Sequence, residues 1–453
     1  MKIYNSIPEE YSSQGTCYGS NRKIYLDFVN ELRQRENAIK NVHLALYLFN
    51  NAYLYQELLN LAKKGVEIVV TSLPLAGYDK RKITDAKRVY EEVINDGEIG
   101  LLIFPHMYLW YGAEYAGGGA AYSFHVKAGT IEYKDETSKA FLTSGNMAPG
   151  DPTHSETTIF IEAPNSSSLV QAFKTFFSII EKRAKPFAEY NKSVVELPSE
   201  LQQVFDFAFV GSTETTDLSQ AHASHAFFTA PSITVGGKGS NHYAREKLVD
   251  IALSAKQRLF VCAQHSHDIS PFDCYRGQTM IGSIIRAKET NPKIDVRVLK
   301  QVASSGLADK RRAAFVEAHL HHARVPQRVN RLVHDKFVVA DDIAVISTSN
   351  FTATQFGWGR RLMEFKTKSE DLRAIQKVVE SADSFFGTPR GVVRAQMTRP
   401  RSGSPKVKVL KDDIFSEVNA FLVIEDAKVA DQMARYFNDL WSHSLSADVK
   451  IPI

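Results

Sequence analysis

The hydrophobic positions near the N-terminus predict a strand, a helix and a second strand in succession. Residues 43–49, HLALYLF, are almost continuously apolar, which is typical of a strand buried on both faces. Leucines then recur at helical spacing over residues 54–65, and Gly65 lies where a helix stop is expected. Residues 66–73, VEIVVTSL, predict the second strand. This βαβ order indicates a parallel sheet.

The same pattern returns in the second half of the chain. Helices are predicted over residues 245–257 and 278–289, and strands over residues 258–263 and 294–300. Each half also closes with a strand ending in Ile-Glu, followed by an amphipathic helix ending in aromatic residues. These closing segments are TTIFIEAPNSSSLVQAFKTFF and NAFLVIEDAKVADQMARYFNDLW. We therefore predict an internal duplication.

The duplication also predicts the domain organisation. At 453 residues the chain is too long for one ordinary core. We expect an α/β protein with a first half over residues 1–195, a linker over residues 196–235 and a second half over residues 236–453. Two long segments, residues 78–121 and 367–412, are expected to be insertions that act as lids or binding loops.

Each half carries one His-x-Lys pair at the start of a predicted hairpin, followed by a small polar cluster that ends in Asn. Side chains two positions apart on a strand point the same way, so each His and its Lys project together. Hairpins from duplicated halves are therefore expected to gather six polar side chains around one point. They are His125, Lys127 and Asn146 in the first half, and His334, Lys336 and Asn350 in the second.

These residue types suit the cleavage of a phosphodiester. The lysines supply fixed positive charge and the asparagines supply amide donors, which together stabilise the charge of the transition state. One imidazole can attack phosphorus and the other can protonate the leaving oxygen. With an ordinary pKa near ~6.5, two histidines can hold opposite protonation states near neutral pH. We expect no metal or other cofactor, because the lysines carry the compensating charge.

Residues 40–190 and 230–445 resemble the phospholipase D superfamily, the phosphodiesterases with two HKD motifs. HDKFVVAD followed by STSN is similar to the family pattern H-x-K-x(4)-D followed by G-S-x-N, and Asp341 is its supporting acid. The resemblance implies two duplicated α-β-α sandwich halves with mixed sheets and an active site at the pseudo-twofold interface. It also implies a covalent phosphohistidine on His125, with His334 as the general acid that then activates water.

The first motif departs from this pattern, because Glu132 stands where the family has Asp. Glu132 as a substitute and Glu132 as an ordinary hairpin residue are both open. The family also has a downstream Glu that orients the histidine. Glu156 fits this position in the first half. In the second half Glu364 and Glu417 compete, and we favour Glu364 because it lies closer to Asn350 along the chain.

Other motifs carry weaker hypotheses. HLHH, residues 319–322, has residue types that bind metal, but no second cluster of ligands accompanies it. QHSHD, residues 264–268, ends a predicted parallel strand, where ligand sites of α/β proteins lie. It either lines the pocket or forms an ordinary polar loop.

Basic residues are concentrated in two segments, although the net charge is only +4. Residues 293–336 hold ten Lys and Arg against four acidic residues, and residues 390–411 hold seven and no acid. Such segments are solvated loops or surfaces that face phosphate. The leading hypothesis is a nuclease that binds DNA or RNA through this basic surface.

The alternative is a phospholipase D or phosphatidyl transferase that acts on phospholipid, since aromatic residues 104–115 either contact a membrane surface or form a buried strand. A third hypothesis is a binding module without chemistry. No apolar run is long enough to span a bilayer, and the N-terminus lacks the layout of a signal peptide. The three cysteines fit neither a disulfide framework nor a metal-ligand spacing. We therefore expect a cytoplasmic protein. Because both motifs lie in one chain, we also expect that a monomer suffices for a complete site.

Overall fold

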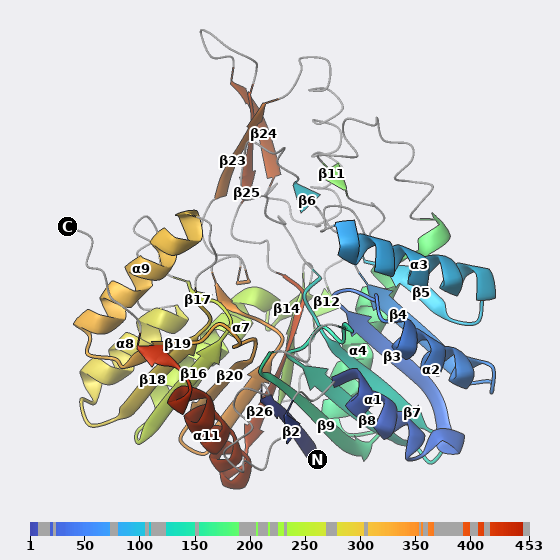
Figure 1. Cartoon of the computed structure of the whole chain (residues 1–453), viewed down its shortest axis with the longest axis horizontal. Coiled ribbons are helices and arrows are strands. Elements are labelled where there is room, and N and C mark those ends of the chain that lie inside the picture. Colours follow the sequence, from blue (N-terminus) through green and yellow to red (C-terminus); the bar gives the residue numbers. More distant parts are fainter. Residues whose placement is uncertain are drawn as a thin grey trace.

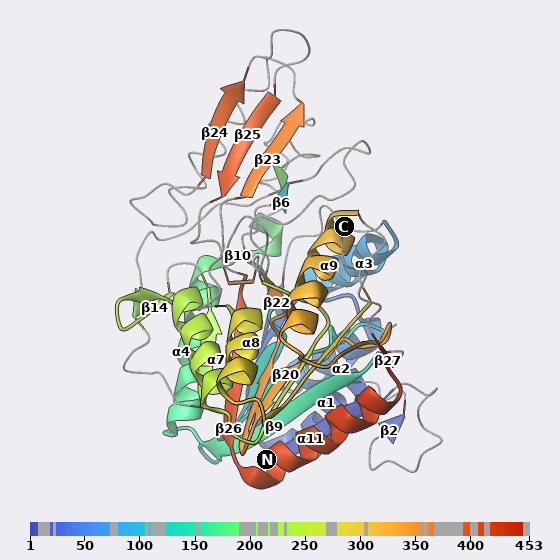
Figure 2. The same cartoon turned by 90° about the vertical axis from the view of Figure 1, so that its left-hand side faces the viewer.

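The computed structural model shows two large mixed sheets with helices packed against both faces of each (Figures 1 and 2). The structure describes residues 1–7, 19–20, 24–72, 80–104, 108–109, 124–149, 154–189, 205–206, 216–217, 225–230, 233–268, 279–302, 307–352, 355–356, 361–366, 393–398, 406–411 and 417–446. Among these residues, no helix is both long enough and apolar enough to cross a membrane.

The first sheet has nine strands in the order β10-β5-β4-β3-β7-β8-β9-β1-β2. Their bounds are β1 Lys2–Ile7, β2 Gly19–Ser20, β3 Ile39–Leu46, β4 Glu67–Ser72, β5 Gly100–Ile103, β7 Ala128–Tyr133, β8 Thr137–Thr143, β9 Glu156–Pro164 and β10 Lys185–Pro186. The helices of this half are α1 Ile24–Arg33, η2 Glu36–Ala38, α2 Ala52–Ala62, α3 Lys80–Asp96 and α4 Ser168–Arg183.

The second sheet has eight strands in the order β13-β26-β21-β20-β16-β18-β19-β27. Their bounds are β13 Ala226–Thr229, β16 Arg258–Ala263, β18 Asp295–Lys300, β19 Gln327–Val329, β20 Lys336–Ala340, β21 Ile343–Ser347, β26 Asn419–Glu425 and β27 Leu445–Ser446. The helices of this half are α7 Ser240–Ser254, α8 Met280–Thr290, α9 Leu307–His322 and α11 Ala427–Ser442.

Shorter strands form small sheets outside these two. β6 Tyr108–Leu109 pairs with β11 Phe205–Asp206, and β17 Ser266–His267 pairs with β22 Phe351–Thr352. β12 Thr216–Asp217, β14 Ile233–Val235 and β15 Lys238–Gly239 form a three-stranded sheet. β23 Arg361–Lys366, β25 Lys406–Lys411 and β24 Val393–Thr398 form another, which projects away from the two large sheets (Figure 2).

The predicted duplication is confirmed strand by strand. The series β10-β5-β4-β3-β7-β8-β9-β1 and the series β27-β19-β18-β16-β20-β21-β26-β13 follow the same order. The parallel and antiparallel pairings also alternate identically along the two series. The chain is therefore an α/β protein of two duplicated α-β-α halves, and eight strands of the first sheet have a counterpart in the second.

Local sequence explains where several elements begin. The side chain of Asn51 accepts the N–H groups of Tyr53 and Leu54 and so caps α2. Asp426 caps α11 in the same way. Beyond α2, Gly65 adopts a φ of +85°, a conformation that glycine tolerates best. The hairpin strands β7 and β20 are buried along their whole length, as their apolar sequences require.

Two expected boundaries move. β13 lies inside the expected linker, yet it pairs with β26 along its whole length, so backbone hydrogen bonds place residues 226–229 in the second half. The expected insertion at residues 78–121 is wrong for its first part, because α3 and β5 continue the first sheet through the pairing of β4 with β5. Most of the rest of that segment, and most of residues 367–412, lie outside the described residues.

The hydrophobic core runs from one half into the other. In α4, Phe176 stacks on Phe228 of β13 with ring centroids 4.2 Å apart. On α11, the Tyr436 hydroxyl donates to the backbone oxygen of Ser6 in β1 at 2.7 Å. Apolar packing and buried hydrogen bonds therefore hold the two sheets in a fixed relation, on which any site between them depends.

Candidate active site

Both His-x-Lys pairs lie where the two halves meet. The backbone N–H of His125 donates to the carbonyl of Val418 at 3.0 Å, and that of Ser155 donates to Leu332 at 2.8 Å. Phe124 and Val418 form one isolated bridge, and Ser155 and Val333 form the other. The residues just before β7 therefore lie against those just before β26, and the residues just before β20 lie against those just before β9.

His334 is bound by a carboxylate from the first half. Its Nδ1 lies 2.6 Å from Oε1 of Glu156, which is 1% exposed. The Ser144 hydroxyl donates to the other oxygen of this carboxylate, and the Ser144 oxygen accepts the N–H of Thr157 at 2.9 Å. Glu156 was expected to orient the histidine of its own half. This expectation is corrected, because its carboxylate crosses the interface and binds the histidine of the other half.

His125 is bound by an amide from the second half. Its Nδ1 lies 3.3 Å from Oδ1 of Asn419, and the Thr348 hydroxyl donates to the same oxygen at 3.0 Å. The Asn419 Nδ2 donates to Oε1 of Gln355 at 2.9 Å, which turns the amide oxygen toward the histidine. A neutral side chain therefore stands here in the place that a carboxylate has beside His334.

Strand register makes Asn419 the counterpart of Glu156. β8 pairs Thr143 with Thr158 in β9, and β21 pairs Ser347 with Phe421 in β26. Counting back two residues along β9 and β26 gives Glu156 and Asn419. The hydroxyl partners correspond as well, since Ser144 and Thr348 each follow the residue paired in this register.

The assignment of Glu364 as the supporting acid of the second half is therefore corrected. Glu364 lies in β23, which pairs with β25 in the separate three-stranded sheet and not with β26. Glu417 is one step removed, because its carboxylate accepts from Gln355, which in turn contacts Asn419. The sequence interpretation missed Asn419 because it searched for an acid.

The two lysines are completely buried beside their histidines. The Nζ of Lys127 donates to the backbone oxygen of His125 at 2.7 Å, and Lys336 donates in the same way to His334. The Lys127 Nζ also lies 5.0 Å from the ring centroid of Tyr47, whose ring is 5.4 Å from that of His125. Two fixed positive charges therefore face the interface.

The site disfavours positive charge on both imidazoles. Burial, followed by the charges of Lys127 and Lys336, lowers the pKa of His125 well below its usual value. Burial, Lys336 and Lys127 lower the pKa of His334 in the same way. Burial raises the pKa of Glu156, which Lys336 opposes. Each lysine acts on both histidines, so the two His-Lys pairs lie near one another at the interface.

The two asparagines lie just after the hairpins. Oδ1 of Asn350 accepts the backbone N–H of His265 at 3.1 Å, which leaves the amide N–H groups as its donor end. Asn146 occupies the equivalent place after β8 and is half-buried. His265 belongs to QHSHD and also lowers the pKa of His334, so this stretch lines the site. In the same stretch, Asp268 caps α8 by accepting the N–H groups of Met280 and Ile281.

His154 is a site residue that the sequence interpretation missed. Its ring centroid lies 5.7 Å from that of His334, two positions before Glu156. The only sequence signal was its presence in HSET beside the predicted Glu. Its counterpart in the second half is Glu417, so the surroundings of the two catalytic candidates differ by more than the Nδ1 partners.

The motif acids lie at the far end of the hairpins. Asp341, at a φ of +49°, accepts the N–H groups that lead into β16, those of Lys256, Gln257 and Arg258, at 2.7 to 2.9 Å. Glu132 binds Lys40 and Lys174. Burial would raise the pKa of Glu132, yet Lys174 and Lys40 lower it to about 2. Both acids therefore stabilise the hairpins at the end far from the histidines, and neither is bonded to a histidine of the site.

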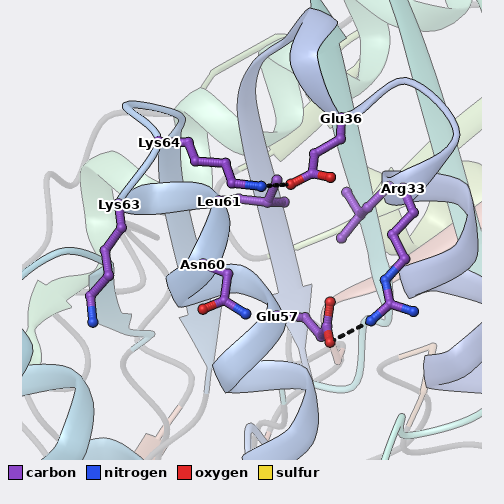
Figure 3. Close-up of a pocket in the computed structure, with 8 residues that line it drawn as sticks. Arg33, Glu36, Glu57, Asn60, Leu61, Lys63 and Lys64 are labelled. Atoms are coloured by element: carbon purple, nitrogen blue, oxygen red, sulfur yellow. Dashed lines mark hydrogen bonds and ion pairs between the residues drawn. The ribbon is translucent and has the colours of Figure 1, made fainter.

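Other polar features lie away from this centre. A cavity of about 290 Å³ lies beside α1 and α2, and four of its charged lining residues form ion pairs, with Arg33 2.6 Å from Glu57 and Lys64 bound to Glu36 (Figure 3). HLHH lies on α9, where Nδ1 of His319 bonds to the carbonyl of Phe315. Within the described part of the chain, no group of three or more His, Cys, Asp or Glu is placed to hold a metal ion.

The basic segment from residue 293 to residue 336 is not one continuous positive surface. Lys300 is buried with Glu317 at 2.8 Å, and Arg297 pairs with Asp295 at 2.7 Å. Lys336 belongs to the site itself. For the second basic segment the backbones of β24 and β25 are placed, and the remainder lies outside the described residues, as do most of aromatic residues 104–115.

Comparison with known proteins gives a fold and no close relative. No protein-family model matches the sequence, and no curated protein matches it. A phosphatidylserine synthase from Haemophilus influenzae is similar in structure, with a TM-score of 0.51 and 11% identity over 98% of this chain and 87% of that one. A polyphosphate kinase from Porphyromonas gingivalis matches with a TM-score of 0.49 and 11% identity, over 97% of this chain and 50% of that one. This chain therefore spans about half the length of that kinase. A mutant of yeast tyrosyl-DNA phosphodiesterase matches with a TM-score of 0.39 and 12% identity, over 91% of this chain and 90% of that one.

Proposed function

We propose that this chain, which has the duplicated fold of the phospholipase D superfamily, is a phosphodiesterase that acts through a covalent phosphohistidine. The observation that carries the proposal is the meeting of two buried His-Lys pairs at the interface, with each imidazole held at Nδ1 by a side chain of the other half. An imidazole held at Nδ1 presents Nε2 for attack or proton transfer.

The lysines and asparagines stabilise charge, and the histidines carry out attack and proton transfer. Lys127 and Lys336 attract the non-bridging oxygens of the phosphodiester, and Asn146 and Asn350 donate amide hydrogens to them. One histidine attacks phosphorus while the other protonates the leaving oxygen. The second histidine then takes a proton from water, and the water oxygen displaces the first histidine from phosphorus. The lysines supply the positive charge that the reaction requires, so we propose that it proceeds without a metal ion.

We propose DNA or RNA as the substrate. The positive charges of the two completely buried lysines suit a phosphate backbone, and the seven basic residues of residues 390–411 add attraction for a polyanion. Phospholipid is the second candidate. It is supported by the likeness of the fold to a phosphatidylserine synthase. In either case both histidines and both of their partners come from one chain, so a monomer supplies a complete site.

A parallel assay in EDTA tests the proposal. The purified protein is incubated with DNA, RNA and phospholipid vesicles, and the variants His125→Ala and His334→Ala are compared with it. His319→Ala on α9 is the matched control, because His319 lies outside the site. We expect hydrolysis of nucleic acid in EDTA that both site variants lose and the control keeps. Cleavage of phospholipid alone would replace the nucleic-acid assignment, and no cleavage of any phosphodiester would refute the function.

A further inference from the structure

The Nδ1 partners of the two histidines differ in charge, although an equivalent hydroxyl binds each partner. In each half a hydroxyl on the residue after the hairpin donates to the partner side chain, and the same hydroxyl oxygen accepts a backbone N–H from the last large strand. The partner is the carboxylate of Glu156 beside His334 and the amide of Asn419 beside His125. Among the groups bonded directly to the two imidazoles, the difference is therefore one of charge.

We infer that His334 is the nucleophile and that His125 is the residue that donates and then accepts the proton. The inference rests on the proposed phosphodiesterase function and reverses the roles that family resemblance implies. His334 Nε2 forms a bond to phosphorus as the bond from phosphorus to the leaving oxygen breaks, and the leaving oxygen takes its proton from Nε2 of His125. In the second step His125 removes a proton from water, and the water oxygen replaces Nε2 on phosphorus.

A carboxylate favours the nucleophilic role for two reasons. It can only accept, so it holds the proton of a neutral His334 on Nδ1 and leaves the lone pair of Nε2 for attack. When Nε2 bonds to phosphorus the ring becomes cationic, and a negative charge 2.6 Å away stabilises that ring. Because two buried lysines already oppose positive charge here, this compensation matters more than in water.

An amide favours the proton-transfer role. Asn419 can keep His125 oriented, but its neutral oxygen at 3.3 Å is shared with Thr348 and compensates little charge. A protonated His125 is then a stronger acid than an ordinary imidazolium, which helps it to release a proton to the leaving oxygen. The arriving phosphodiester supplies the negative charge that lets His125 be protonated at the start.

Covalent trapping separates the two assignments. With bis(4-nitrophenyl) phosphate the leaving phenolate needs no proton, so His125→Asn is expected to release about one equivalent of 4-nitrophenolate and then stall. His334→Asn is expected to give no burst. After digestion at alkaline pH, mass spectrometry should find the aryl phosphate on His334. A burst in His334→Asn with the label on His125 would overturn the inference while supporting the proposed function.

Absence of both turnover and label in the unaltered protein would instead refute the function itself. Two isosteric variants then test the cause. Glu156→Gln should slow the burst by roughly 100-fold or more, because a positioned ionic partner is lost. Asn419→Asp alone should keep the label on His334. The double variant Glu156→Gln/Asn419→Asp exchanges the charges of the two Nδ1 partners and should move label to His125. A label that stays on His334 in the double variant would overturn the carboxylate as the cause.

Discussion

The two halves share a frame and differ in chemistry. Eight strands of one sheet follow the order and the directions of eight strands in the other, and the His, Lys and Asn of the two motifs occupy equivalent positions. Yet the partner of one imidazole is a carboxylate and that of the other is an amide. Duplication of the backbone therefore supplies two similar settings for a histidine, and single side chains give them different charge.

The largest effect is expected where the halves are equal. Lys127→Met and Lys336→Met should each lower kcat/KM by roughly 10³-fold or more, because each lysine faces the shared phosphate and both histidines. The unfolding free energy should also fall, by about 1–3 kcal/mol, since methionine leaves the backbone oxygen of His125 or His334 without its lysine donor. Steady-state kinetics with an activated diester and urea unfolding measure the two quantities. If only one lysine mattered, the site would not be shared.

The motif acids should separate stability from activity. Asp341→Ala removes the acceptor of three backbone N–H groups and should lower the unfolding free energy by about 1–3 kcal/mol. Glu132→Gln loses partly exposed ion pairs and should cost about 1 kcal/mol or less. Urea unfolding measures both. The kcat of the folded protein should stay within about twofold of the unaltered protein in each case, and a larger loss would place these acids in the chemistry.

The histidines should make stability fall with acidity. In the unfolded chain they titrate near ~6.5, whereas burial and the two lysines place the folded pKa of His125 and His334 well below that value. As pH falls through about 6.5, the histidines of the unfolded state bind protons while those of the native state do not, so the unfolding free energy declines. The double variant His125→Asn/His334→Asn should lose less stability between about pH 7 and pH 5. Equal slopes in denaturant titrations would contradict these shifts.

Burial raises the pKa of Asp335 to about 6, which acts in the opposite sense across this range. A folded state that keeps the proton longer than the unfolded state loses stability as pH rises. Asp335 is present in both proteins, so its contribution cancels when the slope of the double variant is subtracted from that of the unaltered protein.

The smallest effect is expected at Glu364. Glu364→Gln should change kcat by less than about twofold, because β23 belongs to a different sheet from Asn419. Asn419→Ala is the informative companion, since it removes the group that orients His125 and should lower kcat by roughly 10-fold or more. The activated diester measures both variants. A larger loss at Glu364 than at Asn419 would restore the original assignment.

Much of the fold could be predicted from sequence because each element carries its own periodicity. The expected strand over residues 258–263 coincides with β16, and the expected helix over 278–289 lies within two residues of α8. The duplicated His-x-Lys pairs could be recognised from their repetition, but the strand alternation expected to orient them is corrected, because β7 begins at Ala128 and β20 at Lys336. Each lysine instead donates to the backbone oxygen of its own histidine. β13 was missed, because its four residues are too short to show a period beside a polar segment.

The partners of the histidines could not be predicted in the same way. Glu156 was found but given to the wrong histidine, and Glu364 was chosen for its closeness to Asn350 along the chain. Contacts between halves depend on how two sheets pack, and no local pattern reports that. Asn419 lacked even a chemical signal, since an amide at the start of a strand resembles many structural asparagines.

The crossing of partners between the halves has an evolutionary consequence. Each imidazole is held by a side chain encoded far away in the other repeat, so neither repeat can change its site residues alone. A mutation at position 156 alters the histidine at 334, and one at 419 alters the histidine at 125. A substitution in one repeat therefore changes the histidine of the other, so the two copies can diverge without any change at the histidines themselves.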